Sequence, residues 1–149
     1  MKLTLSRRYS FSASHRLHSA AFSEAENQRI YGKCANPYGH GHNYVVEITV
    51  RGLPGAPLDE STGMIVNLAD LDAFVHREVI EPFDHVYINE QIAEFRGVVP
   101  TTENLCREIF KRLERFPLAR LERVRIEETS KNCFEMTAEE GDHRKDMAE

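Results

Sequence analysis

The sequence lacks the features that mark membrane, secreted and repetitive proteins. No apolar run approaches the roughly 18 residues that a bilayer-spanning helix needs, and neither an internal repeat nor a low-complexity tract is present. The opening stretch, "MKLTLSRRYSFSASH", alternates too regularly and carries too many polar groups for a signal peptide. There are three cysteines, widely spaced, which does not describe a disulfide framework. Together these absences predict a protein of the reducing cytoplasm that does not contact membranes.

An excess of positive charge is also missing. The formal net charge is -5 at pH 7, whereas a nucleic-acid-binding protein needs a clustered basic face to contact phosphates. We therefore expect no nucleic acid among the partners. The sequence still leaves room for a local basic pocket that binds one phosphorylated small molecule. Judged only by their positive charge, the candidates for this pocket are Arg7, Arg8, Arg16, Arg29 and Lys33.

What is present is an ordinary globular composition of 149 residues, with 41% hydrophobic and 29% charged residues. Side-chain periodicity predicts six elements: strands over 2–15 and 42–51, helices over 68–80 and from Thr101 or Thr102 onward, and strands over 123–128 and 132–137. We expect a loop over 16–39, with room for a short helical turn. The order β-β-α-α-β-β predicts an α+β domain in which two helices cover one face of an antiparallel sheet. This domain spans residues 1–137, and a charged C-terminal tail follows at 138–149.

The stretch "GKCANPYGHGHNY" carries two histidines separated by one glycine. On a strand, residues two apart point to the same side, so His40 and His42 can offer two imidazoles to one metal ion. His15 ends the neighbouring predicted strand and is the natural third ligand across an antiparallel ladder. His18 is the second choice, because it has the wrong parity if that strand continues. Three imidazoles with one open position are typical of catalytic zinc.

Cys34 lies just upstream of this histidine pair, and two roles are open for it. It can be a fourth ligand, which would close the site and make the zinc structural. It can instead be a nucleophile or base beside an open metal position. In that case a cation and a nearby imidazole would lower its pKa.

Two acidic positions also fit a site. Asp84 and His85 stand together after the first helix, and a carboxylate beside an imidazole can orient it and stabilise its charged form. The alternative is a polar helix-exit loop.

Glu128 continues the inward face of the strand over 123–128, and a buried carboxylate needs a partner. It could accept hydrogen bonds from the N–H groups of a ligand, or it could belong to a frayed strand end.

Six segments resemble the 6-pyruvoyl-tetrahydropterin synthase family, in the same order, over residues 3–137: "YSFSASHRLH", "YGKCANPYGHGHNY", "TGMIVNLADL", "EPFDH", "TTEN" and "IEET". The resemblance implies the tunnelling fold, a four-stranded antiparallel sheet with two helices on one face. It also implies that three such sheets join into a barrel. Two trimers would stack into a homohexamer with active sites at subunit interfaces.

The resemblance further implies a role for each candidate residue. Zn²⁺ would be bound by His15, His40 and His42, and Cys34 would be the proton-abstracting thiolate rather than a fourth ligand. The remaining roles fall to a second group of residues. A proton relay, usually from a neighbouring subunit, would use Asp84 and His85. The amino-pyrimidine edge of the pterin would be anchored by Glu128, beside a segment that contains Thr101 and Thr102.

The implied substrate is 7,8-dihydroneopterin triphosphate. Elimination of triphosphate, followed by proton transfers, would give 6-pyruvoyl-tetrahydropterin for tetrahydrobiopterin biosynthesis. No redox cofactor is needed, and the sequence carries no dinucleotide fingerprint. The alternative within the family is 6-carboxy-tetrahydropterin synthase of the queuosine (deazapurine) pathway. In many of those enzymes three residues separate the cysteine from the histidine pair, whereas five separate Cys34 from His40 here. Outside the family, the alternative is a non-catalytic binding module with a closed structural zinc.

Overall fold

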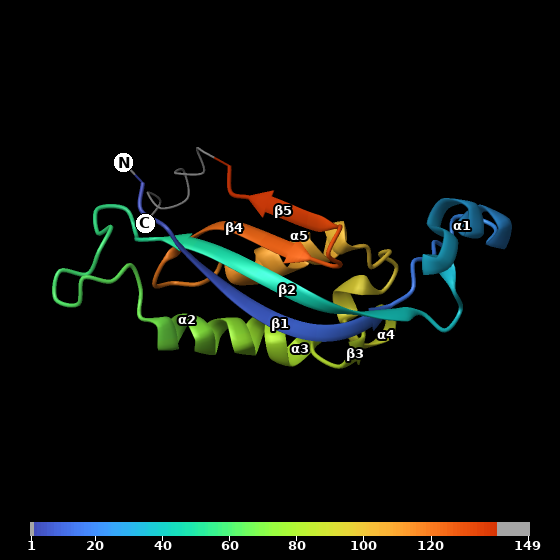
Figure 1. Ribbon diagram of the computed structural model, residues 1–149, viewed down its shortest axis with the longest axis horizontal. Coiled ribbons are helices and arrows are strands. Elements are labelled where there is room, and N and C mark those ends of the chain that lie inside the picture. The colour runs from blue at the N-terminus through green and yellow to red at the C-terminus, as the bar shows by residue number, and fades with distance from the viewer. Residues whose placement is uncertain (1, 140–149) are drawn as a thin grey trace.

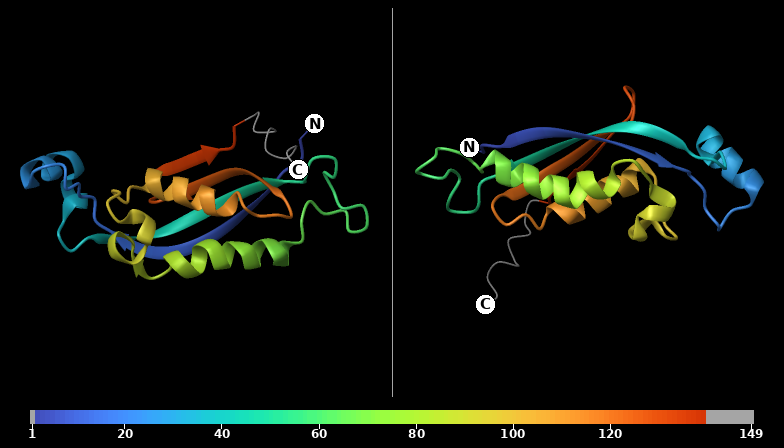
Figure 2. Two further views of the ribbon diagram at one scale, coloured as in Figure 1. Left: turned by 180° about the vertical axis from the view of Figure 1, so that it is seen from behind. Right: turned by 90° about the horizontal axis from the view of Figure 1, so that it is seen from below.

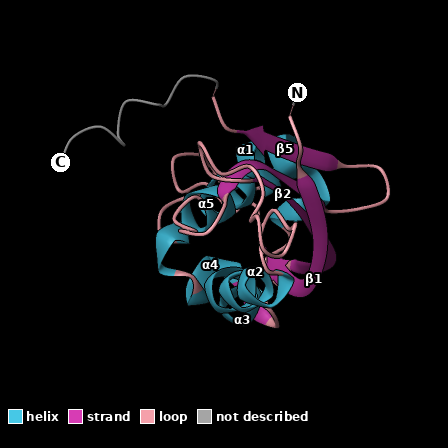
Figure 3. Ribbon diagram, turned by 90° about the vertical axis from the view of Figure 1, so that its left-hand side faces the viewer, coloured by secondary structure: helices cyan, strands magenta, loops and turns pink. Residues whose placement is uncertain are grey.

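The computed structural model describes residues 2–139 as one curved sheet with helices packed on one of its faces (Figure 1). The sheet has five strands in the order β3-β1-β2-β4-β5. Seen along its long axis, the sheet curves around one side of the molecule, and α2 and α5 lie on the other (Figure 3). Within the described residues, no helix is long and apolar enough to cross a membrane.

The longest feature of the sheet is the hairpin of β1 (Leu5–His15) and β2 (His40–Arg51). The two strands pair antiparallel without interruption, from Leu5 opposite Val50 to His15 opposite His40. Alternate residues of both strands enter the core, among them Phe11 and the fully buried Tyr44. The predicted strands are therefore confirmed, although β1 begins three residues later than predicted and β2 two residues earlier.

The predicted helices cover the inner face of this sheet (Figure 2). The first is α2 (Leu68–Val75), which Asn67 caps and which runs on through a π-helical turn at His76–Ile80 into α3 (Glu81–Phe83). The second is α5 (Thr102–Leu113), and its cap is Thr101. Both bury apolar stripes against the sheet: Leu71, Val75 and Val79 from the first, and Leu105, Ile109 and Leu113 from the second.

The prediction of a four-stranded, purely antiparallel sheet is wrong in one detail. β4 (Arg120–Glu127) and β5 (Cys133–Thr137) extend the sheet antiparallel, as predicted. A fifth strand, β3 (Val86–Tyr87), pairs parallel with β1 at Ala13 and Ser14. A strand of two residues is too short to show any side-chain periodicity, so the sequence pattern could not predict it.

The segment over 16–39 agrees with the prediction of a loop with room for a short helical turn. It contains α1 (Glu24–Tyr31) and a 3-10 turn at Gly32–Ala35, which project beyond the end of the hairpin (Figure 1). Two further short helices follow β3: α4 (Ile88–Gln91) and a 3-10 turn at Ala93–Phe95. Of the predicted tail at 138–149, the last ten residues lie outside the described residues.

Candidate metal and active site

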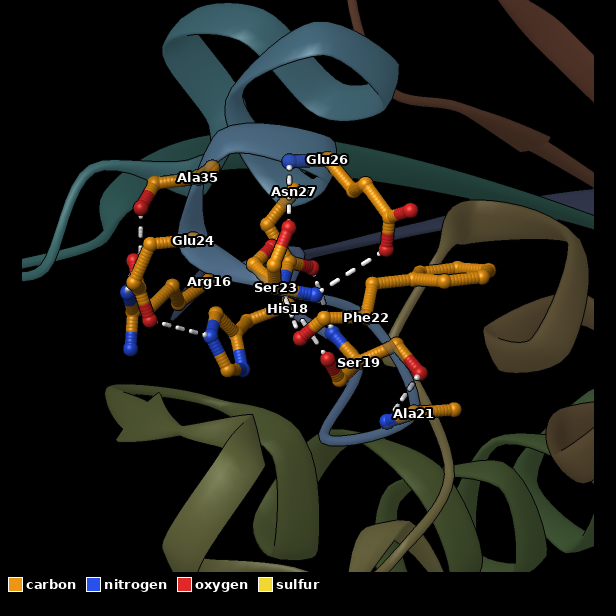
Figure 4. A network of polar contacts seen from close by, with 10 residues as sticks. All are labelled: Arg16, His18, Ser19, Ala21, Phe22, Ser23, Glu24, Glu26, Asn27 and Ala35. Atoms are coloured by element: carbon orange, nitrogen blue, oxygen red, sulfur yellow. Dashed lines mark hydrogen bonds and ion pairs between the residues drawn. The ribbon is translucent and has the colours of Figure 1, made fainter.

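Three histidines meet at the end of the β1–β2 hairpin. His15 is the last residue of β1 and pairs with His40, the first residue of β2, and His42 follows on the same face. Their ring centroids are 4.6 to 5.1 Å apart, and one ligand atom from each lies within 4.8 Å of the others. His18, the second-choice ligand, points elsewhere, because its Nε2 lies 2.9 Å from Oε1 of Glu24 in α1 (Figure 4).

The protonation of the cluster suits a metal ion. Nδ1 of the buried His15 lies 2.8 Å from the carbonyl oxygen of Pro100. Because a carbonyl only accepts, Nδ1 carries the proton, and the bare Nε2 faces Nε2 of His40 at 3.0 Å. Burial lowers the pKa of His15, and burial together with His42 lowers the pKa of His40. Nε2 of His42 is buried without a hydrogen-bond partner. Two imidazoles with lowered pKa values and a third with an unpaired buried nitrogen form a donor set that zinc can bind.

Glu128 brings a carboxylate to the same place. It directly follows β4, and its side chain is 14% exposed. Its Oε1 accepts a hydrogen bond of 2.6 Å from the buried hydroxyl of Thr102 and lies 3.6 Å from Nε2 of His42 and 3.8 Å from that of His15. Its partner is therefore Thr102, whereas Thr101 serves as the α5 cap and accepts from the Asn104 amide at 3.2 Å.

Tyr44 is a neighbour that sequence reasoning missed. Its ring is fully buried, and its hydroxyl lies 3.5 Å from Nδ1 of His15. Burial, with the negative charge of Glu128, raises the pKa of Tyr44 far above its ordinary value, so the phenol stays neutral. The signal was available, because Tyr44 continues the even-numbered face that carries His40 and His42.

Cys34 sits in the 3-10 turn between α1 and β2 and is half-buried. Burial and the negative charge of Glu128 raise the pKa of its thiol. A lowered pKa was expected only with a cation beside the thiol, so it stays a prediction for the metal-loaded site. Among the described residues, the cluster of ligand atoms contains the three histidines and not Cys34.

The path from Cys34 to His40 depends on glycine at one position. Gly39 has φ +70°, a left-handed conformation that other residues adopt at a cost. A Cβ on Gly39 would also lie 2.9 Å from the carbonyl oxygen of His15. Gly39 therefore lets the chain turn back closely enough to begin β2 opposite the end of β1.

Asp84 and His85 form a pair at the edge of the sheet, directly after α3. His85 Nδ1 lies 2.8 Å from Oδ2 of Asp84, and Oδ1 accepts from the Ser12 amide at 2.9 Å. These hydrogen bonds hold the pKa of Asp84 below its usual value. His85 adopts φ +58° and is 81% exposed. It lines a surface depression together with Ser12, Ser14, Asn43 and His42. Within the described chain, the side chains of the pair thus bond to each other and to β1.

Comparison with known proteins points to one family. The family model described as 6-pyruvoyl tetrahydropterin synthase matches residues 4–139. The chain is 46% identical to a 6-pyruvoyl tetrahydrobiopterin synthase of Poecilia reticulata over 129 residues, 86% of this chain and 85% of that one. It is 35% identical over 118 residues to an Archaeoglobus fulgidus protein named provisionally as a 6-carboxy-5,6,7,8-tetrahydropterin synthase, covering 79% of this chain and 90% of that one. Among solved structures, the Caenorhabditis elegans 6-pyruvoyl tetrahydropterin synthase has a TM-score of 0.84 at 38% identity, covering 92% and 96% of the two chains.

Proposed function

The chain belongs to the 6-pyruvoyl tetrahydropterin synthase family, and on that premise we propose that it converts 7,8-dihydroneopterin triphosphate to 6-pyruvoyl-tetrahydropterin with release of triphosphate. The observation that carries this proposal is the meeting of three imidazoles with one carboxylate, Glu128, at the end of a single hairpin. A metal ligand set and an acceptor for a pterin thus lie side by side.

His15, His40 and His42 would hold a zinc ion. When bound, zinc supplies Lewis-acid chemistry that polarises the hydroxyl oxygens of the substrate side chain. The chain contributes the orientation of the ligands. Pro100 fixes the tautomer of His15, and the strand register fixes its distance from His40.

Glu128 would bind the amino-pyrimidine edge of the pterin. That edge presents N–H donors, and an ionised carboxylate accepts such bonds strongly. The Thr102 hydroxyl occupies Oε1 of Glu128 and restrains its rotation, which leaves Oε2 to face a ligand. A pterin held here would place its side chain toward the three histidines.

Cys34 would act as the base. The thiolate takes a proton from a side-chain carbon, the C–H electron pair forms a carbon–carbon double bond, and the C–O bond to triphosphate breaks. Triphosphate leaves with the electron pair of that C–O bond. Burial and Glu128 keep the thiol protonated in the metal-free chain, so we expect Cys34 to become a base only in the loaded site.

Asp84 and His85 would return protons to the intermediate from a neighbouring subunit. Two observations favour this origin. His85 is highly exposed, and its contacts within the described chain run to Asp84 and β1 rather than to the histidine cluster. The proposal therefore includes a homohexamer, a dimer of trimers whose sheets form barrels and whose active sites lie at subunit interfaces. The three free cysteines favour a reducing cytoplasm.

The alternative product is 6-carboxy-tetrahydropterin, which would form from the same substrate with loss of acetaldehyde. The five residues between Cys34 and His40, and the higher identity to the Poecilia reticulata synthase than to the Archaeoglobus fulgidus protein, favour the pyruvoyl product. Incubation of the zinc-loaded protein with 7,8-dihydroneopterin triphosphate and identification of the pterin product test the proposal.

A further inference from the structure

Three segments that are separated in sequence meet directly after the end of β1, next to His15. They are the residues that follow β1, the 3-10 turn that carries Cys34, and the short helix α4. Their contacts run through the backbone of Arg16 and Leu17, directly after the histidine that ends β1. We propose that Asn89, on α4, is a positioning residue for the Cys34 thiol and that it acts through Arg16.

The first link joins Asn89 to Arg16. Oδ1 of Asn89 accepts the backbone N–H of Arg16 at 2.8 Å, and Nδ2 of Asn89 donates to the backbone carbonyl of Arg16, also at 2.8 Å. One side chain therefore satisfies both backbone groups of the first residue beyond the strand. The β1–β2 pairing ends at His15, and these two hydrogen bonds hold the backbone of the next residue, Arg16, in its place.

The second link joins this fixed backbone to the turn that carries the thiol. The guanidinium Nε of Arg16 donates to the carbonyl of Ala35 at 3.1 Å, and the next amide, of Leu17, donates to the carbonyl of Cys34 itself at 2.8 Å. Figure 4 shows Arg16 beside Ala35 and near Glu24, whose Oε2 lies 3.9 Å from its Nη2. Consecutive carbonyls of the turn are thus held by consecutive residues of the segment that follows β1.

The turn needs such restraint because of its glycines. Gly32 is its first residue and Gly39 follows it, both with positive φ values, and glycine gives the backbone its greatest freedom. The helix α1, which precedes the turn, and the loop before it are held together by a buried polar side chain of their own. There, the fully buried Asn27 bonds to Ser19, Phe22 and Ser23 (Figure 4). Among residues 2–139, the bonds of Arg16 and Leu17 therefore form a direct hydrogen-bonded link between the turn and the segment that follows β1.

The helix α4 connects Asn89 to the Asp84–His85 pair along the chain. Asn89 lies two residues after β3, in the same segment as Asp84 and His85. Pairing of β3 with β1 and the two bonds of Asn89 fix this segment against the end of β1. One segment thus orients both the acid–imidazole pair and, through Arg16, the thiol. The role of Cys34 as a base rests on the proposed function, whereas its placement by Asn89 does not.

The test compares Asn89→Ala and Arg16→Lys with Glu90→Gln, an exposed neighbour of Asn89 on the same helix. The main readout is the alkylation rate of Cys34 by iodoacetamide, measured peptide by peptide in the metal-free protein. The exposed Cys133 serves as an internal reference. Loss of the Asn89 bonds should expose the half-buried thiol and speed its alkylation relative to Cys133 by about threefold or more, since access controls thiol reactivity. Arg16→Lys removes the Nε bond to Ala35, changes the contact with Glu24, and provides the same readout if Asn89→Ala does not fold.

Zinc content and steady-state kinetics complete the test. We expect both variants to keep zinc, and we expect kcat to fall about 10- to 100-fold with KM changed little, because a misplacement near 1 Å can cost that much. Glu90→Gln should match the wild type in every readout. Alkylation of Cys34 at the wild-type rate in both variants would overturn the inference. A wild-type protein without synthase activity would instead overturn the proposed function and leave the alkylation result to decide the role of Asn89.

Discussion

His15 and His40 are opposite partners in one antiparallel hairpin, and their Nε2 atoms lie 3.0 Å apart. The ladder between β1 and β2 runs unbroken up to this pair and includes His42, so regular backbone rather than a loop fixes all three imidazoles. Sites built on strands hold their geometry more closely than sites built on loops. The three imidazoles therefore have a rigid base, whereas Cys34 lies on a turn that contains glycine and is less restrained.

Removal of one imidazole should abolish metal binding. In His42→Ala the chain loses the unpaired buried nitrogen and keeps only two imidazoles. Changes to outer-shell partners alone cost about 10- to 100-fold in metal affinity, so we expect loss of a ligand to cost more than that. Zinc titration against a competing chelator measures it. Near wild-type affinity would show that the histidines are not the ligands.

Cys34→Ala should separate metal binding from turnover. The thiol lies outside the cluster of ligand atoms, so we expect the variant to retain zinc. Loss of the base should lower kcat by about 10²- to 10⁴-fold. Metal analysis and kinetics on the same preparation check both expectations. Loss of zinc in this variant would support a closed structural site with Cys34 as the fourth ligand.

Glu128→Gln should weaken substrate binding. The amide keeps the shape of the side chain and an oxygen for the Thr102 hydroxyl, but it loses the negative charge that accepts pterin N–H bonds. A hydrogen bond to a charged group contributes about 1.5–3 kcal/mol, so we expect the Kd of a pterin to rise roughly tenfold to 100-fold. Fluorescence titration measures this, and an unchanged Kd would remove Glu128 from the binding site.

Removal of Glu128's charge should also act on the thiol. Its negative charge contributes to the raised pKa of Cys34, after burial. In Glu128→Gln we therefore expect the alkylation profile of Cys34 in metal-free protein to move to lower pH. Thr102→Val, which keeps the charge, is the matched control and should leave the profile nearly unmoved.

His85→Asn tests the acid–imidazole pair without disturbing the backbone. His85 has φ +58°, and asparagine tolerates this left-handed conformation well. We expect the free energy of unfolding and the zinc content to be unchanged, while kcat falls about 10²-fold through loss of proton transfer. Mixed oligomers of His85→Asn and Cys34→Ala subunits should recover part of the activity if the two groups come from different chains. Wild-type kcat in His85→Asn would exclude the relay.

The stability of the metal-free protein should fall on mild acidification. The pKa values of His15 and His40 are lowered in the folded chain, whereas an unfolded histidine titrates near about 6.5. As the pH falls below that value, the unfolded chain binds protons that the folded chain does not, and the free energy of unfolding decreases. Urea titrations between about pH 7.5 and 5.5 measure this. His40→Gln should show a flatter dependence, and an equally steep one would assign the effect to other groups.

The sequence predicted the hairpin and the meeting of the histidines because both depend on side-chain alternation alone. His15, His40 and His42 share the faces of Phe11 and Tyr44, so strand parity was sufficient. For α1 the sequence indicated only room for a short helical turn, because the buried residue of that helix is the polar Asn27 rather than an apolar stripe. A local signal did exist, since Ser23 and Glu26 form a capping box.

The contacts that complete the site join residues far apart along the chain, and no periodicity encodes them. Thr102 and Glu128 are 26 residues apart, and Arg16 and Asn89 are 73 apart. The direction of the Cys34 pKa was likewise beyond the sequence, because it depends on burial and on the approach of Glu128. Parity could place Glu128 on the inward face but could not identify its neighbours.

Product identification tests the central claim most directly. The zinc-loaded wild type is incubated with 7,8-dihydroneopterin triphosphate under reducing, oxygen-free conditions, with Cys34→Ala as the matched control, and the products are identified by mass spectrometry. We predict 6-pyruvoyl-tetrahydropterin and one equivalent of triphosphate from the wild type, and neither at a comparable rate from the variant. Formation of 6-carboxy-tetrahydropterin with acetaldehyde, or recovery of unchanged substrate, would contradict the account.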